Sequence, residues 1–334
     1  MTRYNAIEVA QDGTLQPTTR ELVEPLPGHV RMRVEACGIC HSDSVAVHVH
    51  DDETGRVPGH EVVGRIDALG DGVTKWELGD RAGVGFLGGH CGECDECRRG
   101  NFVACSDQPM TGVSVDGGYA EYIYVRQSGL VAIPDELTSA EAAPLLCAGF
   151  TVYNALAKGA PAPRDLVAIQ GIGGLGHLAL QYAKALGADV VAIARGTHKE
   201  TLARKLGADH YVDSDAVDPG DALKELGGAG VLVATAASGA SMSPLFKGMR
   251  QGGRFIAVGA SFEPLALSTM DLIFGGFTVE GSLTGRSIEN EDNLRFAARS
   301  GVRPMVENVP LADAASGYAR MLSNAARFRV VLSV

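Results

Sequence analysis

The 334-residue sequence has no long hydrophobic run. Its apolar stretches are short, such as the five residues 190–194, whereas a helix that spans a bilayer needs about 20. Residues 1–13 lack the apolar segment of a signal peptide, and the chain contains no long basic run. The formal net charge is −11, with 40 acidic side chains against 29 Lys and Arg. These absences predict a cytoplasmic protein with no membrane partner and no nucleic-acid partner.

The composition excludes a disordered chain, because hydrophobic residues make up 46% of the sequence and charged residues 21%. The length suits two domains better than one. Residues 1–148 consist of short strand-like runs between Gly, Pro and Asp, which favours antiparallel β structure. From residue 165 onward, apolar strands alternate with helical patterns, including a helix near 241–250, which predicts a doubly wound parallel α/β sheet. The final run, 327–334, is strand-like again and is expected to return to the first domain.

The seven cysteines are an odd number in a chain without a secretory signal, which argues against a disulfide framework and favours metal ligation. Four thiolates in one loop can close a tetrahedral zinc site with no open position, which predicts a structural zinc. An iron–sulfur cluster or four reduced thiols are the alternatives, and the surrounding residues do not separate zinc from iron. The four clustered cysteines are Cys91, Cys94, Cys97 and Cys105.

A second set of metal-ligand side chains is spread along the chain. Cys40 begins a Cys-His-Ser-Asp segment that ends at Asp43, His60 is followed by Glu61, and Cys147 follows two leucines. Two cysteines and one histidine leave a fourth zinc position free for water or substrate, as a catalytic zinc requires. Taken singly, each cysteine also suits a small core residue, and the histidine suits an ordinary hydrogen-bonded side chain. The two carboxylates are candidates to support the ligands, or are ordinary surface residues.

A glycine-rich turn follows the strand-like run 166–170 and opens an amphipathic helix. That context makes the weak GxGxxG pattern a dinucleotide-binding fingerprint, because the glycines let the backbone approach a pyrophosphate and the helix N-terminus offers free N–H groups. A tight turn in a sheet that binds no nucleotide is the alternative. The turn comprises Gly171, Ile172, Gly173, Gly174, Leu175 and Gly176.

Together these segments resemble the zinc-dependent medium-chain alcohol dehydrogenase family. The stretch Gly59-His60-Glu61-x2-Gly64-x5-Gly70-x2-Val73 matches that family's zinc signature, and the other motifs follow the family's order over nearly the whole chain. The resemblance implies a mainly β, GroES-like catalytic domain, residues 1–148 and 287–334, split around a Rossmann-type dinucleotide-binding domain, residues 149–286. It implies hydride transfer between a nicotinamide cofactor and a primary alcohol or aldehyde, with two zinc ions per chain.

The resemblance also implies how the catalytic zinc is held. Cys40, His60 and Cys147 are its ligands, with the fourth position left to water or substrate. Glu61 lies behind the metal and ligates it transiently. Asp43 accepts a hydrogen bond from the ring of His60.

Further roles concern the substrate and the cofactor. By resemblance, Ser42 hydrogen-bonds the substrate oxygen and starts the proton relay. His41 and Arg329 match positions that contact the cofactor pyrophosphate, and Thr151 lies on the nicotinamide side.

The sequence departs from the family pattern in the proton relay. Where many relatives carry a histidine five residues after the first ligand, this chain has Val45, with His48 nearby, so the relay is expected to end at the cofactor ribose and water. Phe86 and Leu87 fall where relatives line the substrate pocket, which favours apolar, aromatic substrates. Cys37 matches no ligand position and is expected in the core. The expected pocket mouth carries an acidic run of Asp51, Asp52 and Glu53.

The choice of cofactor depends on the end of the second strand of the dinucleotide unit. NAD-binding units carry an Asp or Glu about 20 residues after the glycines, which accepts from the ribose 2′-OH. Here Arg195 stands 19 residues after Gly176, and no carboxylate ends the strand. An arginine suits the 2′-phosphate of NADP, with Lys199 as a helper, so the sequence favours NADP(H) over NAD(H). The alternative is NAD(H) with Arg195 stacked on the adenine.

Two other functions compete with an alcohol dehydrogenase. A zinc hydrolase would share the open zinc site but has no use for the glycine turn, and the chain contains no HExxH motif. A non-catalytic relative would bind nucleotide and keep the structural zinc alone, which the presence of all three catalytic ligands disfavours.

The assembly is expected to depend on the run 277–283, which is apolar enough for an exposed edge strand. Proteins seldom leave such an edge bare. By resemblance the strand pairs with its copy across a two-fold axis, which predicts a homodimer or a homotetramer.

Overall fold

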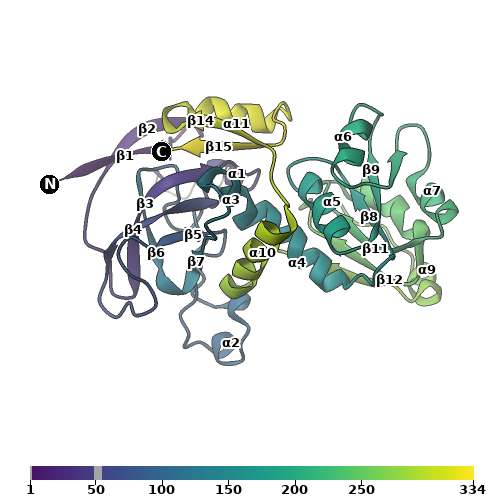
Figure 1. Cartoon of the computed structure of the whole chain (residues 1–334), viewed down its shortest axis with the longest axis horizontal. Coiled ribbons are helices and arrows are strands. Elements are labelled where there is room, and N and C mark those ends of the chain that lie inside the picture. The colour runs from purple at the N-terminus through teal and green to yellow at the C-terminus, as the bar shows by residue number, and fades with distance from the viewer. Residues whose placement is uncertain (1, 49–54) are drawn as a thin grey trace. The chain divides into compact units, whose positions relative to one another are not determined.

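A computed structural model describes residues 2–48 and 55–334 and divides the chain into two compact units (Figure 1). The second unit comprises residues Thr151–Leu283 and Arg299–Val302, and the first unit comprises Met1–Phe150, Thr284–Ala298 and Arg303–Val334. The expected acidic pocket mouth, Asp51, Asp52 and Glu53, lies outside the described residues. Among the described helices, none is long and apolar enough to cross a bilayer.

The first unit is built on a sheet in the order β14-β15-β3-β4-β5-β7, in which β6 also pairs with β3. Neighbouring strands are antiparallel except for β14 and β15, and β1 forms a separate hairpin with β2. The strands are β1 (Arg3–Val9), β2 (Leu15–Glu21), β3 (His29–Gly38), β4 (Val62–Leu69), β5 (Arg81–Val84), β6 (Tyr122–Arg126), β7 (Val131–Ala132), β14 (Val306–Pro310) and β15 (Arg329–Ser333).

Alternation along β3 explains its central place in this sheet. Val30, Met32 and Val34 are buried in the core of the first unit, while the residues between them reach toward the surface. Toward its end β3 becomes buried on both sides, and β15 pairs with it there, with Val331 opposite Gly38. The C-terminal run therefore returns to the first unit.

Short helices connect the strands of the first unit. The helix α3 starts at a capping box, in which the Thr138 hydroxyl accepts from the Glu141 N–H and the Glu141 carboxylate accepts from the Thr138 N–H. It runs directly into a π-helical turn, η3 (Leu145–Gly149). The helices are α1 (Asp43–His48), α2 (Asp95–Arg98), α3 (Ser139–Pro144), α10 (Ser287–Ser300) and α11 (Ala314–Leu322), with 3-10 turns η1 (Phe102–Ala104), η2 (Gln127–Gly129) and η5 (Leu311–Asp313).

The second unit is a parallel sheet in the order β10-β9-β8-β11-β12-β13, the strand order of a Rossmann fold. Every residue of β8 and β11 is buried, as in strands covered on both faces. The strands are β8 (Leu166–Gln170), β9 (Asp189–Ala194), β10 (His210–Asp213), β11 (Ala229–Ala234), β12 (Met249–Ala257) and β13 (Thr278–Gly281). The helices are α4 (Phe150–Gly159), α5 (Gly176–Ala185), α6 (Glu200–Lys205), α7 (Pro219–Glu225), α8 (Gly239–Met242) and α9 (Thr269–Gly275).

The helix expected near 241–250 is wrong in its second half. After α8 the chain continues as a 3-10 turn, η4 (Ser243–Gly248), and Met249 already begins β12. Pro244 explains the change, because it lacks the N–H that would continue an α-helix.

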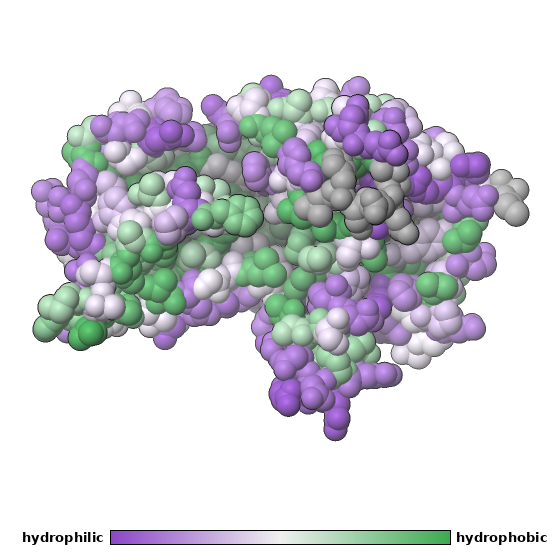
Figure 2. Space-filling view, turned by 180° about the vertical axis from the view of Figure 1, so that it is seen from behind, coloured by the Kyte–Doolittle hydropathy of each residue, from purple (hydrophilic) through white to green (hydrophobic). Residues whose placement is uncertain are grey.

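The strand β13 lies within the expected edge run 277–283 and pairs with β12 alone among the described strands. Val279 on this strand is 39% exposed. Figure 2 shows hydrophobic side chains gathered at the lower left, where α9 lies. The exposed large apolar residues of α9 and of the run 277–283 are Met270, Leu272, Ile273, Phe274, Val279 and Leu283, called the β13 patch below.

Candidate functional site

A buried cluster of metal-ligand side chains lies in the first unit. Donor atoms of Cys40, His60, Glu61 and Cys147 all lie within 4.8 Å of one another. All four side chains are buried. The structure thus brings together the three residues expected to hold a catalytic zinc and the glutamate expected behind it.

Pairing of β3 with β4 places two of these ligands side by side. The Gly38 N–H donates to the Glu61 carbonyl oxygen at 2.9 Å, so Cys40, just after β3, lies beside His60, just before β4. A Cβ atom at position 38 would overlap the Glu61 carboxylate, so any larger residue than glycine there would displace that side chain. Cys147 comes from η3, the π-helical turn between α3 and α4. Such turns recur at functional sites because they re-aim a side chain within a helix.

Asp43 supports this cluster from behind. Its Oδ1 lies 2.9 Å from His60 Nδ1, and its Oδ2 accepts from the Cys40 backbone N–H at 2.9 Å. Burial lowers the pKa of His60, but Asp43 and Cys40 outweigh it and raise that pKa. The Tyr119 hydroxyl donates to Asp43 Oδ2 at 2.8 Å, and no pattern in the sequence singles out Tyr119. Asp43 is therefore a buried hydrogen-bond acceptor and not a surface carboxylate.

Arg329 lies against the same cluster, where its guanidinium forms a buried ion pair with Glu61 Oε1. Burial raises the pKa of Glu61 to about 7 even though the charge of Arg329 lowers it. Among the described residues, neither Glu61 Oε2 nor Arg329 Nε has a hydrogen-bond partner. The expected contact of Arg329 with a pyrophosphate stays a prediction, and the contact that the structure shows is with Glu61.

This donor set fits a zinc ion. The sulfurs of Cys40 and Cys147 are 4.0 Å apart. A zinc tetrahedron with Zn–S bonds of about 2.3 Å has edges of about 3.8 Å. The hydrogen bond between the two thiols lowers the pKa of Cys40 and raises that of Cys147. His60 Nε2 is buried without a hydrogen-bond partner among the described residues, as a ligating nitrogen would be.

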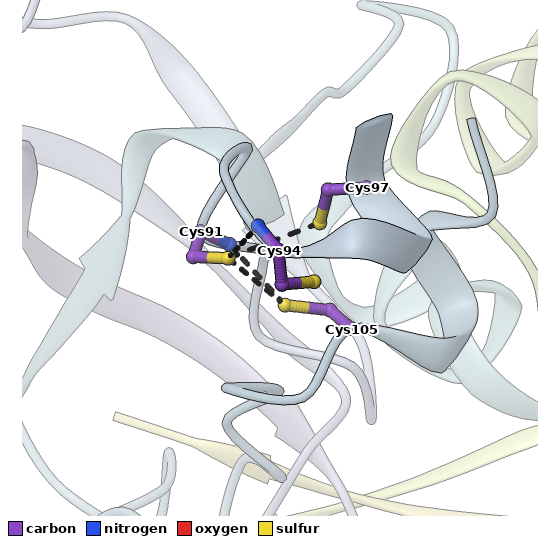
Figure 3. A group of neighbouring side chains, drawn as sticks. All are labelled: Cys91, Cys94, Cys97 and Cys105. Atoms are coloured by element: carbon purple, nitrogen blue, oxygen red, sulfur yellow. Dashed lines mark hydrogen bonds between the residues drawn. The ribbon is translucent and has the colours of Figure 1, made fainter. Parts of the chain in front are cut away.

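The second cluster is the loop of Cys91, Cys94, Cys97 and Cys105, whose side chains converge in Figure 3. Sγ of Cys91 lies 4.0 Å from that of Cys97 and 3.5 Å from that of Cys105. Hydrogen bonds from backbone N–H groups lower the pKa of Cys91 and lower that of Cys94 to about 6, whereas burial raises the pKa of Cys97 to about 12. Four thiolates complete a zinc tetrahedron, and the fit is that of a structural site.

A cavity adjoins the first cluster. The ring of Phe86 lies edge-on to the ring of His60, with the centroids 5.2 Å apart, and Phe86 also lines the cavity. Its wall combines apolar side chains with hydroxyl and amide groups. The lining includes Phe86, Leu87, Val131, Leu146, Phe150, Thr284, Ser287 and Asn290. Phe86 and Leu87 thus line a cavity, and its use as a substrate pocket stays a prediction.

The glycine turn joins β8 to α5 in the second unit. The last glycine of the turn, Gly176, has no room for a Cβ atom, which would overlap the Gly171 carbonyl oxygen. Gly171 itself has φ +89°, a conformation that suits glycine. Lys199 Nζ donates to the Ile172 carbonyl oxygen at 2.9 Å, which ties the start of α6 to this turn. The turn lies between β8 and β11, where the strand order of the sheet reverses, and such switch points bind nucleotides.

The remaining residues singled out by the sequence differ in exposure. Arg195 follows β9, is exposed, and makes no hydrogen bond or ion pair to any described residue. His41 and Ser42 are exposed just before α1, and Val45 and His48 are exposed on that helix. Thr151 is buried on α4 in the second unit.

Two family models match this chain. Residues 26–135 match the alcohol dehydrogenase GroES-like domain, and residues 174–299 match the zinc-binding dehydrogenase domain. The chain is 42% identical to an alcohol dehydrogenase of Geobacillus stearothermophilus over 311 residues, which cover 92% of each protein. The chain therefore belongs to the zinc-dependent medium-chain alcohol dehydrogenase family and is an oxidoreductase. It uses zinc and a nicotinamide cofactor and acts on small alcohols or aldehydes.

Solved structures show the same fold. A cinnamyl alcohol dehydrogenase from Sorghum bicolor is 32% identical, with a TM-score of 0.88, and the match covers 99% of this chain and 98% of that one. The protein CAD from Helicobacter pylori, complexed with NADP(H), is 26% identical, with a TM-score of 0.87 and coverage of 99% and 98%. An acetophenone reductase from Geotrichum candidum, in complex with NAD, is 25% identical, with a TM-score of 0.86 and coverage of 99% and 97%. The two nicotinamide cofactors thus both occur among similar structures.

Proposed function

We propose that this chain interconverts primary alcohols and aldehydes with NADP(H), at a catalytic zinc held by Cys40, His60 and Cys147. The observation that carries the proposal is the convergence of their donor atoms within 4.8 Å, beside a cavity lined by Phe86. A zinc ion there would lower the pKa of an alcohol and polarise a carbonyl, and a nicotinamide would carry the hydride.

The chain's own residues orient the reactants and move the proton. Asp43 fixes the ring of His60 and the backbone of Cys40, so that two ligands keep one geometry. Ser42, exposed beside Cys40, hydrogen-bonds the substrate oxygen and accepts its proton while passing its own hydroxyl proton on. Because Val45 has no titratable side chain, the onward path of the proton would have to be supplied by water and by the ribose of a bound cofactor.

Two residues that line the cavity support an apolar substrate. Phe86 and Leu87 offer aromatic and aliphatic surface to a hydrophobic group, while the hydroxyl or carbonyl oxygen is directed to the buried ligand cluster. Aromatic primary alcohols and aldehydes combine these two features. The cinnamyl alcohol dehydrogenase of Sorghum bicolor is named for a substrate of this kind.

The proposed reaction is tested with a panel of primary and secondary alcohols, aliphatic and aromatic, and both nicotinamide cofactors. The absorbance of the reduced nicotinamide should rise on addition of a primary alcohol and fall on addition of the aldehyde. Removal of zinc by a chelator should abolish the change, and added zinc should restore it. Turnover that survives complete removal of zinc, or that is confined to secondary alcohols, would overturn the proposal.

We further propose that the chain binds two zinc ions with different roles. Cys97→Ser should remove one ligand of the complete set and lower the free energy of unfolding by at least about 2 kcal/mol. A loss of that size lowers the melting temperature by roughly 4–8 °C. Differential scanning calorimetry with metal analysis checks this. The kcat/KM of the folded fraction should stay within about threefold of the parent. An unchanged melting temperature with two zinc ions still bound would contradict the assignment.

The assembly proposed for this chain is a homodimer or homotetramer formed through β13. A lysine on an edge strand opposes pairing with a second copy, so Val279→Lys should shift the protein toward monomer in light scattering over a concentration series. Val217→Lys is the matched control, because Val217 is 52% exposed but lies outside the β13 patch. A monomeric parent, or equal effects of the two variants, would contradict this assembly. The cytoplasmic location stays a prediction.

A further inference from the structure

The turn that carries Cys147 has an irregular hydrogen-bond pattern. In η3 the Phe150 N–H reaches back five residues to the Leu145 carbonyl oxygen, which is the π-helical spacing. All five residues of η3 are buried. Buried carbonyl oxygens need donors, and a single turn of π-helix is not a stable element by itself. Some other part of the first unit must therefore stabilise this turn.

Two buried asparagines of α10 supply the donors. Asn293 Nδ2 donates to the Leu145 carbonyl oxygen at 3.0 Å, and Asn290 Nδ2 donates to the Leu146 carbonyl oxygen at 3.1 Å. Asn293 Nδ2 also donates to Asn290 Oδ1 at 3.0 Å, so the two amides orient each other. Asn293 is fully buried and Asn290 is 3% exposed.

The packing around these amides leaves little freedom. At Gly85, a Cβ atom would come within 2.7 Å of the Leu146 carbonyl oxygen and 3.6 Å of Asn290 Nδ2. The Leu146 carbonyl group is thus confined between Gly85, which follows β5, and the Asn290 amide. Asparagine is an unusual choice for a fully buried helix position, since an amide in the interior is costly unless its groups are satisfied. Here the amide N–H groups are satisfied by the carbonyl oxygens of Leu145 and Leu146, the two residues that precede Cys147.

We propose that Asn290 and Asn293 are positioning residues that hold η3 in its π-helical form and thereby aim Cys147 at the metal. The inference rests on the proposed function, in which Cys147 is a zinc ligand. Without the two amides, the turn relaxes toward a regular α-helix, which rotates the Cys147 side chain relative to Cys40 and His60. Neither asparagine contacts the metal in this arrangement.

The decisive variant is Asn293→Leu, which keeps the branching of the side chain at Cγ but is larger and removes both amide N–H donors. Partners that orient metal ligands typically affect metal affinity by about 10–100-fold, so a loss of about tenfold or more is expected. Zinc is titrated out with a chelator while metal content is followed. One zinc per chain should leave at a lower chelator concentration than in the parent, while the zinc of the four-cysteine loop is retained. With Co²⁺ in place of zinc, the thiolate-to-cobalt absorption should weaken.

Glu291→Gln is the matched control. Glu291 is on the same helix and nearly as buried, but its carboxylate accepts from the Ala132 N–H of β7 and pairs with Arg295, away from η3. It should keep the parental zinc affinity and cobalt spectrum. Should Asn293→Leu fail to fold, Asn290→Ala serves instead, because Asn290 lines the cavity and a water can fill the space.

The outcomes separate this inference from the proposed function. Parental zinc affinity and an unchanged cobalt spectrum in folded Asn293→Leu or Asn290→Ala would overturn the positioning role. An equal loss of zinc in Glu291→Gln would overturn it too, since the effect would then be one of general stability. Should Cys147→Ala leave zinc content and turnover unchanged, the assignment of the ligand fails, whatever the asparagine variants do.

Discussion

Replacement of Cys147 by alanine is expected to abolish turnover while the fold survives. The variant loses one of three proposed zinc ligands, and the metal is expected to contribute several kcal/mol to the reaction. Each 1.36 kcal/mol is a factor of ten, so kcat/KM should fall by roughly a thousandfold or more. Metal analysis should find one zinc per chain instead of two. Removal of a single buried sulfur should leave the far-ultraviolet circular dichroism unchanged.

Cys37→Ala is the control for this experiment. Cys37 is buried in the core of the same unit, and it belongs to neither ligand cluster. Its replacement should keep both zinc ions and leave kcat/KM within about threefold of the parent. Equal losses in Cys37→Ala and Cys147→Ala would show that the core, and not ligation, is being disturbed. One zinc per chain in the fully active parent would also contradict the proposed pair of metal sites.

The four-cysteine loop could be predicted from the sequence alone because its ligands are local. Cys91 and Cys105 bracket a single loop, so no knowledge of the fold is needed to bring them together. Cys40, His60 and Cys147 come from two strand ends and a helical turn, and spacing leaves each open to an ordinary structural interpretation. The family resemblance, and not the spacing, made these three a set, and the structure places their donor atoms together.

The residues that support the ligands could not be predicted in the same way. Tyr119 is 76 residues from Asp43, and Asn290 and Asn293 are 144 and 148 residues from the carbonyls that they meet. A buried tyrosine or asparagine gives no periodic pattern in the sequence, since its contribution to stability depends on a hydrogen-bond partner that only the tertiary fold brings near. The π-helical turn has no sequence signature for the same reason: its widened geometry depends on the donors from α10.

The second unit could be predicted more fully, because its strands are buried on both faces and read as continuous apolar runs. The alternation of such runs with helical patterns gave the parallel sheet, and the glycine turn lies at the reversal of strand order. The wrong helix prediction near residues 241–250 has a local cause. Apolar side chains suit either a helix or a strand there, and Pro244 and the start of β12 decide between them.

The preference for NADP over NAD is expected to depend on Arg195. Its guanidinium is exposed at the end of β9 and has no hydrogen-bond or ion-pair partner among the described residues, so it is available to a 2′-phosphate. A hydrogen bond to a charged group contributes roughly 1.5–3 kcal/mol. At about 1.4 kcal/mol per tenfold, that corresponds to a preference of about 10-fold to 150-fold. Measured kcat/KM with the two cofactors, at saturating alcohol, should show this ratio.

Substitutions at this position should reverse or remove the preference. Arg195→Asp should favour NAD, because the carboxylate repels a phosphate and accepts from a free 2′-OH. Arg195→Ala should weaken NADP with little gain for NAD, mainly through the KM of the cofactor. The effect should fade at high salt, since an exposed charge pair is screened. Lys205→Ala is the control, because it removes an exposed positive charge from the end of α6 and should leave the ratio unchanged. A parent enzyme with equal or higher kcat/KM for NAD would refute the phosphate contact and leave Arg195 to stack on the adenine, with the family assignment untouched.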